Sequence, residues 1–273
     1  MKAKRWAIRP RRFNTHVQVF LCAIFISIAA APAQETNTLR IKAPLRAEIN
    51  HDESLPSLPD QYQVGNQFDE AKLQNLTPDN IWFPIPNWLA GGWHSETKTV
   101  DYVQDCKTGA STSPHTVVKE VSDAIHGHQR DKTGQIWEFI EIPHMRKVEL
   151  THGVAYLRAL REEVIETDPS QVILKVLTNQ ITVDGKKQEI AASNQVQQIG
   201  TYIPLDDGLV QLDASVRNFD GDGAAIQMQR NALLMKRSKP YSDMDTLHGL
   251  DLKKLFAEFL NKTGRQDLVP KQP

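Results

Sequence analysis

The sequence has little cysteine, few aromatic residues and no long apolar run. Its 273 residues include two cysteines, and aromatic residues make up 7% of the chain. Two cysteines cannot build the disulfide framework of a small secreted scaffold, so stability must come from a hydrophobic core, for which the chain is long enough. The longest apolar run, from Val19 to Ala30, is shorter than the roughly 20 residues that a membrane-spanning helix needs.

An excess of positive charge is also missing. The 32 basic residues are balanced by 33 acidic residues, which gives a formal net charge of −1. Proteins dedicated to nucleic-acid binding normally carry a basic excess. We therefore expect no nucleic-acid partner.

The standard catalytic motifs are absent. The sequence contains no Gly-x-Ser-x-Gly, no His-Glu-x-x-His, no phosphate-binding glycine loop and no dinucleotide fingerprint. Their absence removes the usual reasons for assigning an enzyme. We expect no cofactor and favour a non-enzymatic function.

The N-terminal 33 residues have the three parts of a secretory signal peptide. Six basic residues precede the apolar run, and Ala31-Pro32-Ala33 is a small-x-small site. This pattern predicts cleavage after Ala33 and a secreted or periplasmic protein, with an uncleaved membrane anchor as the alternative. Cleavage would remove six basic and no acidic residues, leaving 26 basic and 33 acidic residues and a net charge of −7.

The remaining chain divides into three parts. Residues 34–80 contain proline-rich breaks and predict an extended arm, with one short helix near Asp69–Leu76. Residues 81–240 contain short segments with β-strand character, separated by turn signals, and predict a β-domain. Residues 241–273 predict a C-terminal helix and tail. The predicted strands are 97–104, 116–125, 136–142, 146–150, 153–160, 163–167, 172–182, 188–192, 195–203, 209–218 and 225–238.

This series of short strands and turns predicts a mostly β fold, which is an antiparallel barrel or sandwich with a C-terminal amphipathic helix. Tight turns such as Asp206-Asp207-Gly208 and Asp220-Gly221-Asp222-Gly223 favour hairpins. The absence of long helices between the strands excludes a doubly wound sheet. In the C-terminal segment, Leu252, Leu255, Phe256, Phe259 and Leu260 fall on one side of a helix, which Asp251 can cap and Gly264 can end.

Gly91-Gly92-Trp93 opens the series of strands and resembles the Gly-x-Trp motif on the first strand of calycin-type barrels such as lipocalins. The resemblance implies that Trp93 closes the base of a barrel and that the barrel encloses a binding cavity. On this hypothesis Trp82, Trp88 and Trp93 contact an apolar ligand. The alternative is that these tryptophans are plain core residues.

His126-Gly127-His128 is the best metal-binding candidate, because histidines at i and i+2 of a strand share one face. A third ligand could come from His115, His144 or His152. The alternative is a pair of exposed histidines at a strand end. Glu162 and Glu163 would point to opposite faces of a strand, and we interpret both as solvated charges.

The leading hypothesis is a secreted or periplasmic, non-enzymatic β-rich protein that binds an apolar or amphipathic small molecule or an envelope protein. One alternative is a metal-dependent extracytoplasmic enzyme that uses His126 and His128. The other is a structural component of an envelope assembly. A membrane would be contacted only through an uncleaved signal.

Overall fold

The computed structural model describes residues 50–74 and 79–270, and it is mostly β. The predicted signal peptide lies outside the described residues. The strands are β1 (Asp79–Ile85), β2 (Gly91–Asp105), β3 (Ser111–Thr112), β4 (Thr116–His126), β5 (Gln129–Arg130), β6 (Ile136–Ile142), β7 (His144–Leu150), β8 (Gly153–Thr167), β9 (Val172–Asp184), β10 (Ile190–Asp206), β11 (Leu209–Asp220), β12 (Ala225–Lys239), β13 (Thr246–Leu247) and β14 (Leu250–Asp251). The helices are α1 (Leu252–Lys262) and the 3₁₀ segments Asp60–Tyr62, Glu70–Gln74 and Gln266–Leu268.

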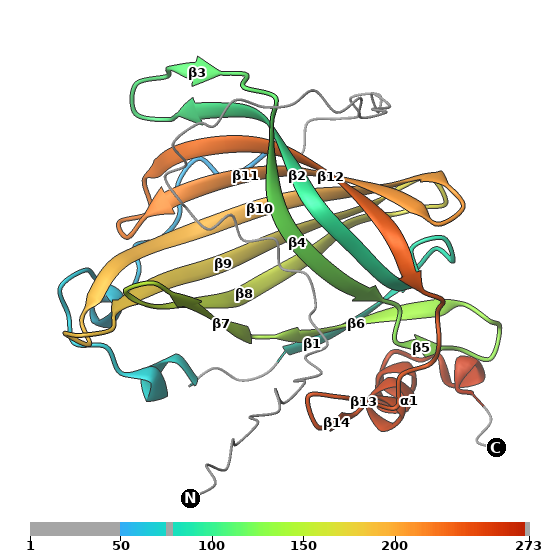
Figure 1. Ribbon diagram of the computed structural model, residues 1–273. Coiled ribbons are helices and arrows are strands. Elements are labelled where there is room, and N and C mark those ends of the chain that lie inside the picture. The colour runs from blue at the N-terminus through green and yellow to red at the C-terminus, as the bar shows by residue number, and fades with distance from the viewer. Residues whose placement is uncertain (1–49, 75–78, 271–273) are drawn as a thin grey trace, which may run out of the picture.

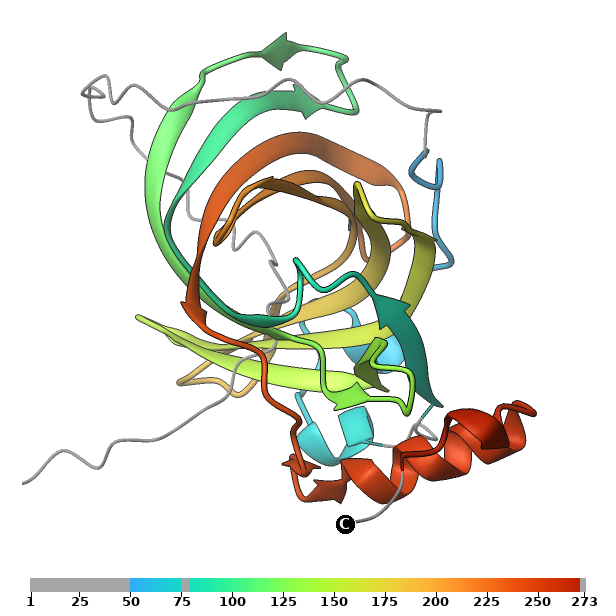
Figure 2. The same cartoon turned by 90° about the vertical axis from the view of Figure 1, so that its right-hand side faces the viewer.

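One large antiparallel sheet dominates the fold. Its strand order is β3-β2-β12-β11-β10-β9-β8-β7, and β4 also pairs with β2. The sheet curls into a half-barrel, and the smaller sheet β1-β6-β5 lies near its open side (Figure 1, Figure 2). The predicted mostly β, antiparallel architecture with a C-terminal helix is therefore confirmed.

The turns form where the sequence predicts them. The loop between β11 and β12 begins at Asp220, whose carboxylate accepts hydrogen bonds from the backbone N–H of Asp222 and Ala224, and Gly223 has a φ of +84°. Asp184 accepts from two backbone N–H groups in the turn after β9. Aspartate and glycine thus fix the hairpins as turn chemistry requires.

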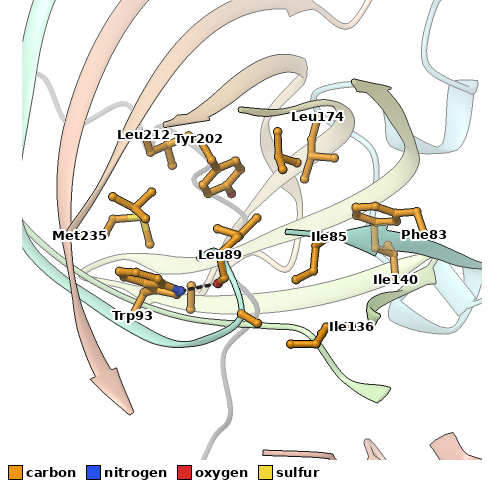
Figure 3. Close-up of a cluster of buried hydrophobic side chains, with 14 of the residues drawn as sticks. Phe83, Ile85, Leu89, Trp93, Ile136, Ile140, Leu174, Tyr202, Leu212 and Met235 are labelled. Atoms are coloured by element: carbon orange, nitrogen blue, oxygen red, sulfur yellow. Dashed lines mark hydrogen bonds between the residues drawn. The ribbon is translucent and has the colours of Figure 1, made fainter. Parts of the chain in front are cut away.

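The concave side of the large sheet holds the main hydrophobic core. Leu174, Tyr202, Leu212 and Met235 project from the sheet towards residues of β1, β6 and the loop before β2 (Figure 3). Trp93 is 1% exposed, and its indole N–H donates to the carbonyl of Leu89 at 2.7 Å. The guanidinium of Arg237 lies 4.4 Å from the Trp93 ring centroid and donates to the carbonyls of Trp88 and Ala90.

Helix α1 covers the other side of the small sheet. Asp251 caps its start by accepting from the backbone N–H of Lys254, and Gly264, just beyond its end, has a φ of +74°. Three buried residues of the helix, Leu252, Phe256 and Leu260, pack against Trp82, Trp137 and Phe139. The predicted helix and its apolar side are confirmed.

The described part of the N-terminal arm packs on the convex side of the large sheet. Leu58, Tyr62 and Leu73 form a buried cluster with Ile181, Ile190 and neighbouring sheet residues. The backbone N–H of Leu55 and Leu58 donate to carbonyls of the β11–β12 turn. The short helix predicted near Asp69–Leu76 is present as the 3₁₀ segment Glu70–Gln74.

Candidate functional site

A cluster of buried polar residues lies on the inner side of the fold, where β4, β6, β8 and β10 supply one side chain each. We call His126, Glu138, Glu162 and Tyr202 the inner polar cluster. Strand alternation places these residues with the core: Glu138 shares a face of β6 with Ile136 and Ile140, and Glu162 pairs with Val176. The ring centroids of His126 and Tyr202 are 5.1 Å apart.

A tight turn after β4 positions the histidines. Gly127 has a φ of +82°, and a Cβ atom there would lie 2.7 Å from Cγ2 of Ile136, so only glycine fits. The backbone N–H of Gly127 donates to Oε2 of Glu138, and that of His128 donates to the carbonyl of Trp137. The turn therefore holds His126 and His128 on either side of the Glu138 carboxylate.

The two histidines have opposite hydrogen-bonding roles. A carboxylate can only accept, so Nδ1–H of His126 donates to Oε1 of Glu138 at 3.3 Å. Nδ1 of His128 instead accepts from the backbone N–H of Phe139 at 3.1 Å. In the neutral rings, Nε2 of His126 is then an acceptor and Nε2 of His128 a donor. Both Nε2 atoms are buried and have no hydrogen-bond partner among the described residues.

The two buried glutamates differ in protonation. Burial by itself raises the pKa of Glu138, but His128 and His126 beside it outweigh burial and lower that pKa. Burial, together with the nearby Glu138 carboxylate, raises the pKa of Glu162 to about 8. Burial and the same two carboxyl groups raise the pKa of Tyr202. At neutral pH the cluster therefore combines one carboxylate, one carboxylic acid and one phenol.

The inner wall beyond this cluster is partly polar. By strand alternation, Gln180, Asn194 and Asn218 share the inner face with Leu174, Tyr202 and Leu212. Side-chain atoms of all three amides are buried without a hydrogen-bond partner among the described residues, and Asn218 lacks a partner for both its nitrogen and its oxygen. Unpartnered buried amides are unusual, because each costs free energy.

The structure brings His126 and His128 to the carboxylate of Glu138. The interpretation of the two histidines as exposed is wrong, because they are 8% and 1% exposed. A carboxylate bound to an imidazole is also a common support for metal-ligating histidines. Among the described residues, however, neither histidine belongs to a group of three donor atoms that lie within 4.8 Å of one another. Metal binding at His126 and His128 stays a prediction, and His144 lies elsewhere, beside His248.

The three predicted ligand-binding tryptophans occupy different environments. Trp82 packs with Phe139 and Phe256 under helix α1, whereas Trp93 lies in the inner core. Trp88 is partly buried, donates to the carbonyl of Pro169 at 2.8 Å, and lines a pocket of about 260 Å³ with Arg237 and the β10–β11 turn. The tryptophans do not form one site, and their contact with a ligand stays a prediction.

Sequence reasoning missed the acidic half of the inner polar cluster. Glu163 is half-exposed and forms an ion pair with Arg161 at 3.0 Å, as expected for a solvated charge. For Glu162 the interpretation as a solvated charge is wrong, because its side chain is buried and makes no hydrogen bond or ion pair with a described residue. Glu138 could have been found from the apolar residues around it, Ile136, Phe139 and Ile140, which indicate a strand buried on both sides.

Comparison with protein-family models, with curated proteins and with solved structures finds no match. No helix in the described ranges combines the length and apolar character needed to cross a membrane.

Proposed function

We propose that the inner side of the curled sheet binds a small amphipathic molecule through a neutral hydrogen-bonding group. The observation that carries this proposal is the unpartnered, buried Nε2 of His126, together with the buried Glu162 carboxyl, whose pKa is raised by burial and by Glu138. Leaving such groups without a partner costs about 1–3 kcal/mol each. A ligand that pairs with them recovers this free energy.

The protonation of the cluster selects the chemistry of the ligand. Glu138 is an anion at neutral pH, whereas Glu162 is protonated and can donate a hydrogen bond. A ligand carboxylate near Glu138 would be repelled in this buried setting. A hydroxyl or carbonyl group can accept from Glu162, and a hydroxyl can also donate to His126. The ligand class is therefore an apolar molecule with an alcohol or carbonyl group.

The surrounding wall suits such a molecule. Small apolar residues, Ala159, Ala214 and Val216, are buried on the same inner face as the unpartnered amides. Binding sites for small molecules commonly combine apolar walls with a few polar anchors. A calycin-type barrel, a non-enzymatic role and export by the predicted signal peptide belong to this proposal.

The test is a competition assay that uses N-phenyl-1-naphthylamine, a neutral probe whose fluorescence rises in apolar sites. Dodecanol and dodecanoate, which share one chain length, compete for the probe at pH 7. We expect dodecanol to displace the probe at least tenfold more effectively than dodecanoate. Failure of the probe and dodecanol to bind, or equal displacement by the carboxylate, would contradict the proposal.

A matched pair of variants locates the site. Glu162→Leu should weaken dodecanol binding about five- to tenfold, because one hydrogen bond is worth roughly 1 kcal/mol. Glu162→Gln keeps a neutral donor and should retain the affinity. Glu163→Leu, on the opposite face of β8, is the control and should bind like the wild type. Equal affinities for Glu162→Leu and Glu163→Leu would place the ligand elsewhere.

A further inference from the structure

A second cluster of ionisable residues lies outside the inner polar cluster, at the junction of β6, β7 and the β13–β14 hairpin. It consists of Glu141, near the end of β6, His144, the first residue of β7, and His248, in the hairpin turn. One donor atom from each residue lies within 4.8 Å of the other two. The Nδ1 atom of His248 is 2.9 Å from Oε2 of Glu141.

The two imidazoles face the same carboxylate. Their rings are stacked, with centroids 5.2 Å apart and planes inclined by 12°. Glu141 and His144 are half-buried, whereas His248 is more exposed, so the cluster opens to solvent. A small ion can reach it without a change in the fold.

The turn that carries His248 holds it in an unusual conformation. His248 and Gly249 connect paired residues Leu247 and Leu250 and have φ angles of +49° and +86°. A two-residue turn with both φ angles positive is of type I′, in which asparagine or aspartate is preferred before glycine. Histidine is also among the non-glycine residues found most often at positive φ. Its presence puts an imidazole, and not an amide, against Glu141.

We propose that Glu141, His144 and His248 bind a divalent transition-metal ion, with Zn²⁺ as the best fit. Two imidazoles and one carboxylate are an established ligand set for zinc, and three protein ligands leave a fourth position for water. Ligand atoms around a tetrahedral Zn²⁺ lie about 3.3 Å apart. Side-chain rotations that move the donor atoms by about 1 Å reach that spacing from the observed arrangement.

The ion would join two parts of the chain that are far apart in sequence. Glu141 and His144 belong to the strands beside the core, whereas His248 lies four residues before α1. Helix α1 otherwise docks through apolar contacts with Trp82, Trp137 and Phe139. A metal bound there would link the C-terminal hairpin, and the helix that follows it, to the strands beside the core, and binding to the folded state would add to stability.

The experiment is a Zn²⁺ titration of full-length protein stripped of metal with EDTA and dialysed, in competition with the chromophoric chelator 4-(2-pyridylazo)resorcinol. We expect one equivalent of Zn²⁺ to bind. At a free concentration about 100 times the Kd, the melting temperature should rise by about 5–10 °C. Co²⁺ in place of Zn²⁺ should give the visible absorption of a four-coordinate site.

Variants assign the bound ion to this cluster. His248→Asn keeps a residue that type I′ turns favour, so it removes the ligand without disturbing the hairpin. It and His144→Gln should each weaken Zn²⁺ binding about 100-fold or more. The control His94→Asn removes an exposed histidine that is bonded to Asp123 and should bind Zn²⁺ like the wild type.

Two results would overturn the proposal. One is the absence of Zn²⁺ binding by the wild-type protein at tens of micromolar metal. The other is binding that survives in His248→Asn and His144→Gln but is lost in a His126→Gln, His128→Gln double variant. That second result would assign the metal to the buried histidine pair.

Discussion

Replacing the buried Glu162 with glutamine should change how stability depends on pH. The pKa of this carboxyl is about 8 in the folded protein, against an ordinary value of 4.5. Between these values the folded protein keeps one proton that the unfolded chain releases. The free energy of unfolding therefore falls as pH rises, by about 1.4 kcal/mol for each pH unit.

The size of the effect follows from the same values. Stability associated with the protonated carboxyl is fully present below pH 4.5 and is lost as pH rises towards 8. The accumulated loss is about 3 kcal/mol at pH 7 and about 4 kcal/mol at pH 8. Glutamine has nearly the same shape and does not ionise, so Glu162→Gln escapes this loss. The variant should gain about 3–4 kcal/mol on the wild type between pH 5 and pH 8.

The assay is urea denaturation followed by tryptophan fluorescence at pH 5, 6, 7, 8 and 9. Other titrating groups are shared by both proteins, so they cancel in the difference between wild type and variant. Glu163→Gln is the control, because its side chain is half-exposed and should give a small difference that does not vary with pH. A difference for Glu162→Gln that stays constant from pH 5 to pH 8 would refute the reasoning.

Two further substitutions test the fold around both candidate sites, with chemical denaturation as the measurement. Phe256→Ala removes a buried ring of α1 that contacts Trp82, and it should lower the free energy of unfolding by about 3–5 kcal/mol. The control Glu258→Ala, on the exposed side of the helix, should change stability by less than about 0.5 kcal/mol. Equal effects of the two substitutions would mean that the helix is not docked. Gly127→Ala should cost about 2–4 kcal/mol, because strain at positive φ and a clash with Ile136 add together. The control Gly134→Ala, with open space around it, should lower the free energy of unfolding by about 1 kcal/mol. A similar loss of stability in both variants would show that no clash with Ile136 occurs.

Much of the fold could be predicted because its elements carry local signals. Asp220 and Gly223 mark a hairpin through turn chemistry, and the spacing of the apolar residues in α1 marks a helix. The prediction split β8 into 153–160 and 163–167, whereas one strand spans Gly153–Thr167. Its pairing with β9 shifts register between Ala159 and Arg161 and again between Val164 and Glu166. These irregularities break the alternation that sequence reasoning relies on.

The candidate sites were harder to predict, because each depends on contacts between distant residues. His126 could be singled out by its spacing from His128, but its partner Glu138 lies on a separate strand. His248 and Glu141 are 107 residues apart in sequence. Burial decides the protonation of Glu162, and a local pattern cannot distinguish its environment from that of Glu163. Topology, which a single sequence specifies only indirectly, supplies this information.

Strand β6 shows how one short segment can serve two chemistries. Successive side chains of a strand point to opposite faces. Glu138 therefore lies on the inner face of β6, with Ile136 and Ile140. Glu141 lies on the outer face with Trp137 and Phe139, next to the C-terminal hairpin and helix. The inner glutamate is an anion held by a histidine and a backbone N–H, and the outer one meets two imidazoles at the surface. A shift of register by one residue would exchange these faces and destroy both sites together. The pairing of β6 with β1, which runs without a break from Ile136 to Ile142, therefore determines both the amphipathic-ligand proposal and the metal proposal.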